Sequence, residues 1–217
     1  MAIDLILYLL LLLSISLYGI VSYKKLTIPF KALAITILWI SLSEIAARVL
    51  ARTIHNSSPT YHILCIFLYA GFTVTYSQLL TGARLKKGLL LSIIPFTILC
   101  IVNIIFFQSF FSFPSNTIVI SYLLFVVYSL ILFMQMLNAP KEVNIFKQGI
   151  FWFNIAMLVY SIITPLCFGV SNYLHVHKLY ANLLNDFIEY FCFVYYATLG
   201  YAIYLDKNRY KMTLVPA

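Results

Sequence analysis

The sequence predicts an all-α polytopic membrane protein, a bundle of seven transmembrane helices with the N-terminus outside and the C-terminus cytoplasmic. Of the 217 residues, 63% are hydrophobic and 9% are charged, whereas soluble domains carry about 25% charged residues. Seven apolar stretches are each long enough to cross a hydrocarbon core of about 30 Å, which takes roughly 20 helical residues. Basic residues fall mostly in alternate connections between these stretches. Together these three observations exclude a soluble globular class.

The seven predicted spans fill almost the whole chain. They lie at 4–22, 29–50, 61–81, 88–107, 116–137, 148–170 and 181–205. The first begins with Asp4 rather than a basic residue and is followed by Lys24 and Lys25, so we expect a retained helix rather than a cleaved signal. Membrane strands are a poor alternative, because they alternate apolar and polar residues over about 10 positions. The connections are short, so we expect a single domain over residues 1–217.

Orientation follows from Lys and Arg, because cytoplasmic loops hold the excess of these residues. Only Arg48, Arg52 and Lys178 fall on the side of the predicted N-terminus. The other side holds Lys24, Lys25, Lys31, Arg84, Lys86, Lys87, Lys141, Lys147, Lys207, Arg209 and Lys211. This asymmetry explains the net charge of +8 and predicts attraction to anionic lipid headgroups. Because the charges lie in separate short loops, we expect no nucleic acid partner.

Away from the span ends, ionisable side chains enter only two predicted spans, where each costs about 2.5 to 3.5 kcal/mol on insertion scales. The second span carries Glu44 and Arg48, and the seventh carries two acids and two amides in one stripe. Residues three and four apart share a helix face, and the two sets lie at matching depth toward the outer side. We therefore expect an outward-facing polar pocket for a small polar or cationic ligand, or for protons. Its predicted lining is Glu44, Arg48, His62, Asn182, Asn185, Asp186 and Glu189.

Plainer interpretations of these residues stay open. Glu44 and Arg48 could form only an intrahelical ion pair, and the seventh-span stripe could only join helices by hydrogen bonds. A zinc-type site is a further alternative, because His175 and His177 precede Asp186 and Glu189 closely. The four cysteines are spread one to a span, without metal or redox spacing. We expect neither a metal nor a cofactor.

Two parts of the chain show collinear echoes. Tyr8-Leu9-Leu10 corresponds to Tyr122-Leu123-Leu124, and Phe30-Lys31 corresponds to Phe146-Lys147. Such echoes suggest two parallel three-helix repeats joined by one helix, an organisation known among SWEET transporters. The acids of the seventh span have no counterpart in the third.

Three short runs carry a resemblance to a known family. They are Thr53-Ile54-His55-Asn56, Tyr61-His62-Ile63 and Phe151-Trp152-Phe153-Asn154. The chain resembles an uncharacterised family of short bacterial seven-helix inner-membrane proteins, which are similar to the membrane portions of some sensor histidine kinases. The resemblance implies a sensor-like bundle without an attached kinase. The ceramidase and progestin-receptor-like zinc hydrolases are a competing comparison, but Asp186 and Glu189 stand where their last helix has a histidine pair.

These features lead to one functional expectation and two alternatives. We expect a sensor-like or receptor-like protein of the cell membrane, most simply the bacterial inner membrane, that is not an enzyme. Its signal would pass through the basic cytoplasmic loops to a membrane or cytoplasmic partner. The first alternative is a small solute or proton-coupled transporter with a 3+1+3 helix organisation. The second is a membrane-embedded, metal-dependent hydrolase.

Overall fold

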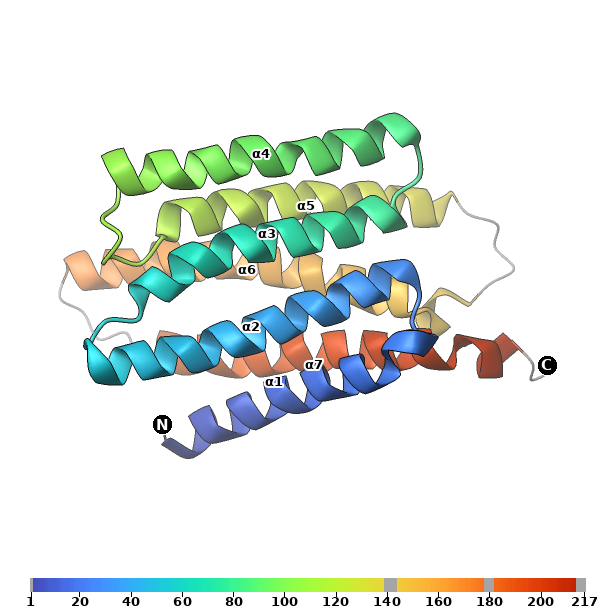
Figure 1. Cartoon of the computed structure of the whole chain (residues 1–217), viewed down its shortest axis with the longest axis horizontal. Coiled ribbons are helices and arrows are strands. Elements are labelled where there is room, and N and C mark those ends of the chain that lie inside the picture. The colour runs from blue at the N-terminus through green and yellow to red at the C-terminus, as the bar shows by residue number, and fades with distance from the viewer. Residues whose placement is uncertain (1, 139–143, 178–181, 214–217) are drawn as a thin grey trace. The chain divides into compact units, whose positions relative to one another are not determined.

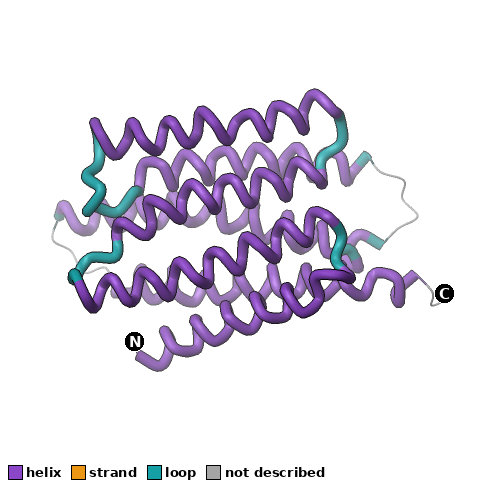
Figure 2. The backbone as a smooth tube through the Cα atoms, viewed as in Figure 1, coloured by secondary structure: helices purple, strands orange, loops and turns teal. Residues whose placement is uncertain are grey.

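The computed structural model of the chain describes residues 2–138, 144–177 and 182–213. Over these ranges the chain is helical and forms no strand (Figures 1 and 2). Seven α-helices are joined by short connections, two of which contain the 3-10 helices η1 (Tyr23–Lys25) and η2 (Ile145–Lys147). The α-helices are α1 (Ala2–Ser22), α2 (Ile28–Thr53), α3 (Ser58–Leu79), α4 (Ala83–Phe106), α5 (Ser115–Leu137), α6 (Gly149–Val176) and α7 (Asn182–Thr213).

The seven predicted helices are confirmed, and the differences lie at their ends. The second continues to Thr53 rather than residue 50, and the fourth begins at Ala83 rather than residue 88. The seventh continues to Thr213 rather than residue 205. Arg and Lys are good helix formers, so a helix continues into its basic flank after the apolar run has ended. The apolar run therefore marks the part suited to hydrocarbon rather than the whole helix.

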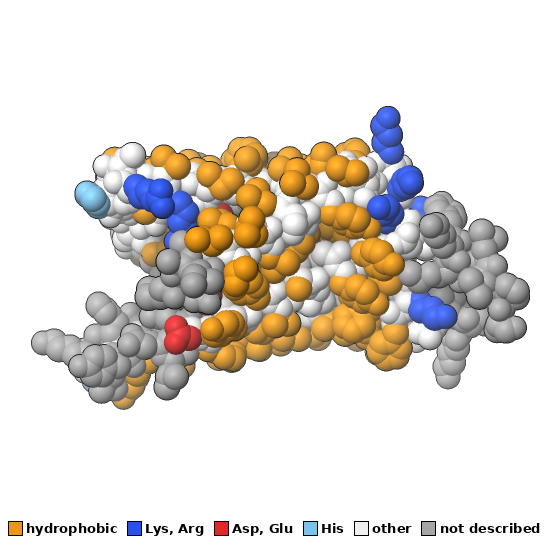
Figure 3. Space-filling view, turned by 90° about the horizontal axis from the view of Figure 1, so that it is seen from below, with side chains coloured by type: hydrophobic (Ala, Val, Ile, Leu, Met, Phe, Trp, Pro, Cys, Tyr) orange, Lys and Arg blue, Asp and Glu red, His pale blue; other side chains and the backbone are white. Residues whose placement is uncertain are grey.

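Six of the helices in the described ranges, α1 to α6, are long and apolar enough to cross a membrane. The seventh helix falls outside that set because Asp186, Glu189 and several tyrosines interrupt its apolar run. On the face seen in Figure 3, hydrophobic side chains cover the middle of the helices, while Lys and Arg side chains lie toward the helix ends. This composition is compatible with a multi-pass membrane protein.

The backbone packs into two compact units, Met1–Ile118 and Val119–Ala217. We call them the N-terminal unit and the C-terminal unit and describe each by itself. The boundary falls in the first turn of α5. The single domain expected over residues 1–217 stays a prediction. Lys141 and Lys178, which entered the orientation argument, lie outside the described residues.

The N-terminal unit is built from consecutive antiparallel helices. Helix α1 packs beside α2, α2 packs beside α3, and α3 packs beside α4 (Figure 1). The Ser41 hydroxyl of α2 donates to the Ile37 carbonyl at 2.9 Å, and it also lies 3.4 Å from the Leu12 carbonyl of α1. Between α3 and α4, the Tyr69 ring stacks on the Phe96 ring with centroids 3.8 Å apart. Aromatic stacking between α3 and α4 and the Ser41–Leu12 contact between α1 and α2 thus join helices whose outer faces stay apolar.

The contact between α2 and α3 is closest at Gly71. A Cβ atom built on Gly71 would lie 2.8 Å from the Thr36 Cγ2 atom and closer still to the Thr36 hydroxyl. Thr36 is 4% exposed, and its hydroxyl is directed back to the Ala32 carbonyl at 2.9 Å. Only a residue without a Cβ atom permits this approach. Small residues bring membrane helices together in this way, because packing rather than hydrophobic exclusion joins helices in lipid.

The C-terminal unit joins α5, α6 and α7. The Asn154 side chain of α6 is fully buried and donates to the Ser129 carbonyl of α5 at 3.0 Å. The Tyr160 ring of α6 stacks on Tyr195 of α7, with centroids 3.9 Å apart, and meets Tyr122 of α5 edge-on at 5.6 Å. One amide and one tyrosine therefore tie the central helix of this unit to both neighbours.

The Gly71 contact predicts a steric effect on stability. Gly71→Ala should lower the free energy of unfolding by about 1 to 3 kcal/mol, the usual cost of overpacking. Gly88→Ala is the matched control on α4, because a Cβ atom there meets nothing within 4 Å. Alanine favours a helix over glycine by about 1 kcal/mol, so this control should be neutral or stabilising. Thermal unfolding in detergent micelles, followed by circular dichroism, measures both.

Thr36→Ala provides the second half of this test. Removing the hydroxyl and methyl of Thr36 leaves room for a methyl group at position 71, so the double variant should recover most of the loss. If Gly71→Ala lowers the free energy of unfolding equally in the wild-type protein and in the Thr36→Ala variant, the steric explanation is ruled out.

Candidate functional site

An ion pair joins Glu44 and Arg48 in the C-terminal half of α2, as their spacing predicts. Arg48 Nη2 lies 3.7 Å from Glu44 Oε2. The distance exceeds the usual range of a hydrogen bond, so the pair is an electrostatic contact only. The Glu44 side chain is 11% exposed, whereas the Arg48 side chain is 44% exposed. The carboxylate is thus buried in the helix packing while the guanidinium reaches outward.

The second partner of Glu44 comes from the next helix. The Tyr61 hydroxyl, in the first turn of α3, is hydrogen-bonded to the Glu44 carboxylate. The Oε2 atom of Glu44 is buried and has no hydrogen-bond partner among the described residues. Buried acceptors are nearly always satisfied, and an ionised one is costly to leave open. The arrangement is therefore suited to receive a proton, a hydrogen-bond donor or a small cation at Oε2.

His62 contacts a loop rather than the Glu44 carboxylate. Its Nε2 atom lies 2.9 Å from the Ser112 carbonyl oxygen, in the loop between α4 and α5. A carbonyl only accepts, so Nε2 carries the proton in this contact. The imidazole stacks on the Phe110 ring with centroids 5.4 Å apart, and His62 is 3% exposed. Adjacent residues on a helix point about 100° apart, which lets Tyr61 reach α2 while His62 reaches the loop.

A second polar cluster holds the ends of that loop. Asn103, near the end of α4 and 5% exposed, donates to the Gln108 side chain at 2.9 Å. Gln108 donates in turn to the Ser115 hydroxyl at 2.8 Å. The Asn116 amide of α5 donates to the Asn103 side-chain oxygen at 3.2 Å. Asn103 and Gln108 each act as both donor and acceptor, so the network specifies how the loop connects α4 to α5.

The predicted acids of α7 belong to the C-terminal unit. Asp186 is exposed, and Glu189 is half-buried one turn further along the helix. The side chains of Asn182 and Asn185 lie outside the described residues. Because the α7 acids and Glu44 belong to different units, their convergence into one pocket stays a prediction.

A further buried carboxylate lies near the other end of α7. Asp206 is 6% exposed, and its Oδ1 atom lies 3.7 Å from Arg209 Nη1. The predicted helix ended at residue 205, which left Asp206 outside the set of intramembrane charges. The spacing of three residues between Asp206 and Arg209 is the signal that could have found this pair.

Thiols and potential metal ligands are dispersed. Within the described ranges, no group of three or more His, Cys, Asp or Glu side chains comes together. Cys65 of α3 and Cys100 of α4 are both buried and share a hydrogen bond across the helix contact. In the C-terminal unit, the Cys192 sulfur lies 3.5 Å from the Tyr160 hydroxyl. Each of these thiols is part of helix packing.

Comparison with known proteins adds no relative. Searches of protein-family models, of curated proteins and of solved structures found no match to this chain.

The His62 contact predicts a local change in protection of the loop. His62→Phe keeps an aromatic ring for stacking but removes the donor to the Ser112 carbonyl, a loss of about 1 kcal/mol. Backbone amides of residues 109–113 should then exchange hydrogen for deuterium faster, measured by mass spectrometry in detergent. Phe110→Leu is the control that keeps the hydrogen bond and loses the ring stacking. Unchanged exchange in His62→Phe would show that the imidazole does not hold the loop.

Proposed function

We propose that the chain is a sensor-like protein of the cell membrane that responds to protons or a small cation at Glu44. In this proposal the seven helices cross the bilayer, most simply a bacterial inner membrane, with the N-terminus outside and the C-terminus cytoplasmic. The support is the set of six apolar helices and the basic residues in alternate connections. The seventh helix would cross with Tyr195 and Tyr196 buried in the protein, while Asp186 and Tyr190 stay exposed.

The observation that carries the proposal is the open Oε2 atom of Glu44. It is buried, lies 3.7 Å from the Arg48 guanidinium, and receives no hydrogen bond from the part of the chain that the structure describes. Ionised Glu44 attracts Arg48 into the helix surface, whereas neutral Glu44 does not. Proton uptake therefore changes the side-chain position of Arg48 and the hydrogen bond from Tyr61. Both changes act at the α2–α3 contact, which is the part of the proposed sensor that changes conformation.

The α7 residues complete the proposed pocket. Asp186 and Glu189 would add negative charge for a small polar or cationic ligand, and Asn182 and Asn185 would add neutral hydrogen-bonding groups. His62 would act indirectly, by holding the loop that follows α4. Output would pass through the basic cytoplasmic connections to a membrane or cytoplasmic partner, since these are the charged surfaces on that side.

A proton-coupled or small-solute transporter is the second candidate. The division between α1–α4 and most of α5–α7 resembles the division that a 3+1+3 organisation requires. The echoed residues differ in environment, however: Phe30 is 2% exposed and Phe146 is 61% exposed. We therefore rank the transporter below the sensor.

Topology is the first test. A fluorescent protein that folds only in the cytoplasm should fluoresce when fused to the C-terminus, and alkaline phosphatase should be active when fused within the α2–α3 turn. The chain should remain in the membrane fraction after alkaline carbonate extraction. Release by carbonate, or the reverse pattern of the two reporters, would contradict the proposed insertion or orientation.

Proton exchange at Glu44 is the second test. Infrared difference spectra between acidic and alkaline samples should contain a protonated-carboxyl band that Glu44→Gln abolishes. The amide keeps the shape of the side chain and still accepts from Tyr61, but it neither exchanges this proton nor holds the charge. Glu142→Gln, in the connection between α5 and α6, is the control and should keep the band.

The fluorescence of Trp39, whose ring lies 4.4 Å from Phe67 across the α2–α3 contact, gives a conformational readout in a Trp152→Phe background. A pH-dependent change should be present in that background and lost with Glu44→Gln. A spectrum that Glu44→Gln leaves unaltered at every pH would refute the assignment.

A further inference from the structure

The loop between α4 and α5 exposes aromatic rings without any charge. Residues 107–114 read Phe-Gln-Ser-Phe-Phe-Ser-Phe-Pro, and no Asp, Glu, Lys, Arg or His occurs anywhere between residues 88 and 140. Phe107 is 74% exposed and Phe111 is 63% exposed. Phe106, at the end of α4, is also 74% exposed. Water-facing loops are ordinarily polar, so this surface is suited to an apolar neighbour.

Several polar groups of the loop backbone are paired within the protein. The Phe111 carbonyl accepts from the Asn56 side chain at 2.7 Å, and the Ser112 carbonyl accepts from His62. The Phe111 amide donates to the Ser109 hydroxyl at 3.3 Å, and the Ser112 amide donates to the Ser109 carbonyl at 2.9 Å. Non-helical backbone enters a membrane boundary only when its hydrogen bonds are satisfied by protein. The backbone groups of Phe111 and Ser112 meet that condition, while the Phe107 and Phe111 rings are exposed.

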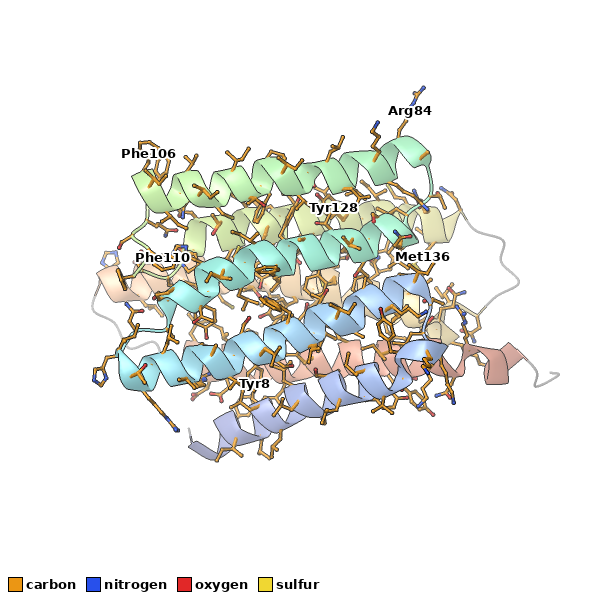
Figure 4. The ribbon with its side chains drawn as sticks, in the orientation of Figure 1. Tyr8, Arg84, Phe106, Phe110, Tyr128 and Met136 are labelled. Carbon is orange, nitrogen blue, oxygen red and sulfur yellow. The ribbon has the colours of Figure 1, made fainter. Side chains whose placement is uncertain are left out.

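The exposed rings continue an apolar ridge along α4. Ile94, Ile98 and Ile105 are 61%, 56% and 66% exposed, and they follow one another at helical spacing toward Phe106. Figure 4 shows Phe106 at the end of α4 and Phe110 in the loop that follows. A protein-binding patch normally has a polar rim with charged residues, which this uncharged stretch does not supply. The lipid that surrounds α4 is the neighbour that matches both the ridge and the loop.

We propose that the α4–α5 loop is a lipid-binding element whose Phe107 and Phe111 rings insert at the boundary between headgroups and acyl chains. The inference rests on the proposed membrane insertion and adds a specific contact to it. Its partner is the lipid leaflet that contains the end of α4 and the start of α5. The network of Asn103, Gln108 and Asn116 holds the loop in the shape that presents these rings.

Depth-dependent fluorescence quenching tests the proposal. Phe111→Trp and Phe107→Trp are each made in a Trp39→Phe, Trp152→Phe background and reconstituted into phosphatidylcholine vesicles. Lipids brominated near the headgroup should reduce emission about twofold, more than lipids brominated near the chain ends. Aqueous iodide should have little effect. Ile98→Trp, in the middle of the α4 ridge, is the reference for membrane insertion and should be quenched best by bromine near the chain ends.

The Ile98→Trp reference distinguishes failure of the membrane assignment from failure of the lipid-binding loop. Quenching of Ile98→Trp by iodide but not by brominated lipid would remove the membrane assignment and this inference with it. Bromine quenching of Ile98→Trp together with iodide quenching of Phe111→Trp would leave the membrane assignment standing and overturn the lipid-binding loop. A Phe111→Trp emission shielded from both quenchers would identify a protein neighbour and overturn it as well.

A second measurement keeps both native tryptophans. A nitroxide spin label is attached to Phe111→Cys. Of the native cysteines, three are buried and the fourth, Cys192, is partly exposed, so the unsubstituted chain treated with the label gives the background signal. Relaxation of the label should be faster with oxygen, which concentrates in lipid, than with a water-soluble nickel complex. The reverse order would place residue 111 in water and overturn the proposal even if the tryptophan variants do not fold.

Discussion

Satisfaction of backbone hydrogen bonds within each helix is the constraint on which this structure depends. A chain with 63% hydrophobic residues has few side chains able to pair with exposed peptide groups, so regular helices are the economical solution in an apolar environment. Once the backbone is satisfied, buried polar side chains help determine where helices meet. Asn154 pairs with a carbonyl of α5, and Tyr61 pairs with the carboxylate of α2. Where no polar pair is present, close packing takes over, as at Gly71 and Thr36.

Glu44 and the α4–α5 loop both lie near the N-terminal end of α3, and short contacts connect them. Tyr61 reaches Glu44, the neighbouring His62 reaches Ser112, and Asn56 in the preceding turn reaches Phe111. A displacement of the first turn of α3 therefore acts on both the carboxylate and the loop. If Glu44 is the sensing group and the loop is bound to lipid, the start of α3 is the element that links them. The physical coupling is a pair of adjacent residues pointing in different directions on one helix.

Helix number and the Glu44–Arg48 pair were predictable because both depend on local periodicity. An apolar run of about 20 residues marks a helix of membrane length, and a spacing of four residues marks a shared face. The role of Tyr61 was not predictable in the same way, since an aromatic residue at a helix end also suits a headgroup position. His62 was expected in the pocket, but its recorded contacts are with the α4–α5 loop. Asp206 was missed because the hydropathy of the seventh span ends before the helix does.

The sequence by itself determined the helical class, the number of helices, the distribution of charge between the two ends and the residues that share a face on α2. These properties follow from periodicity and composition, which act within one segment at a time. Tertiary structure decided which partner each polar side chain has: Tyr61 for Glu44, Ser112 for His62 and Gln108 for Asn103. Pairing between helices depends on their rotation and register, and these are set by close contacts such as Gly71 with Thr36 that no single segment encodes.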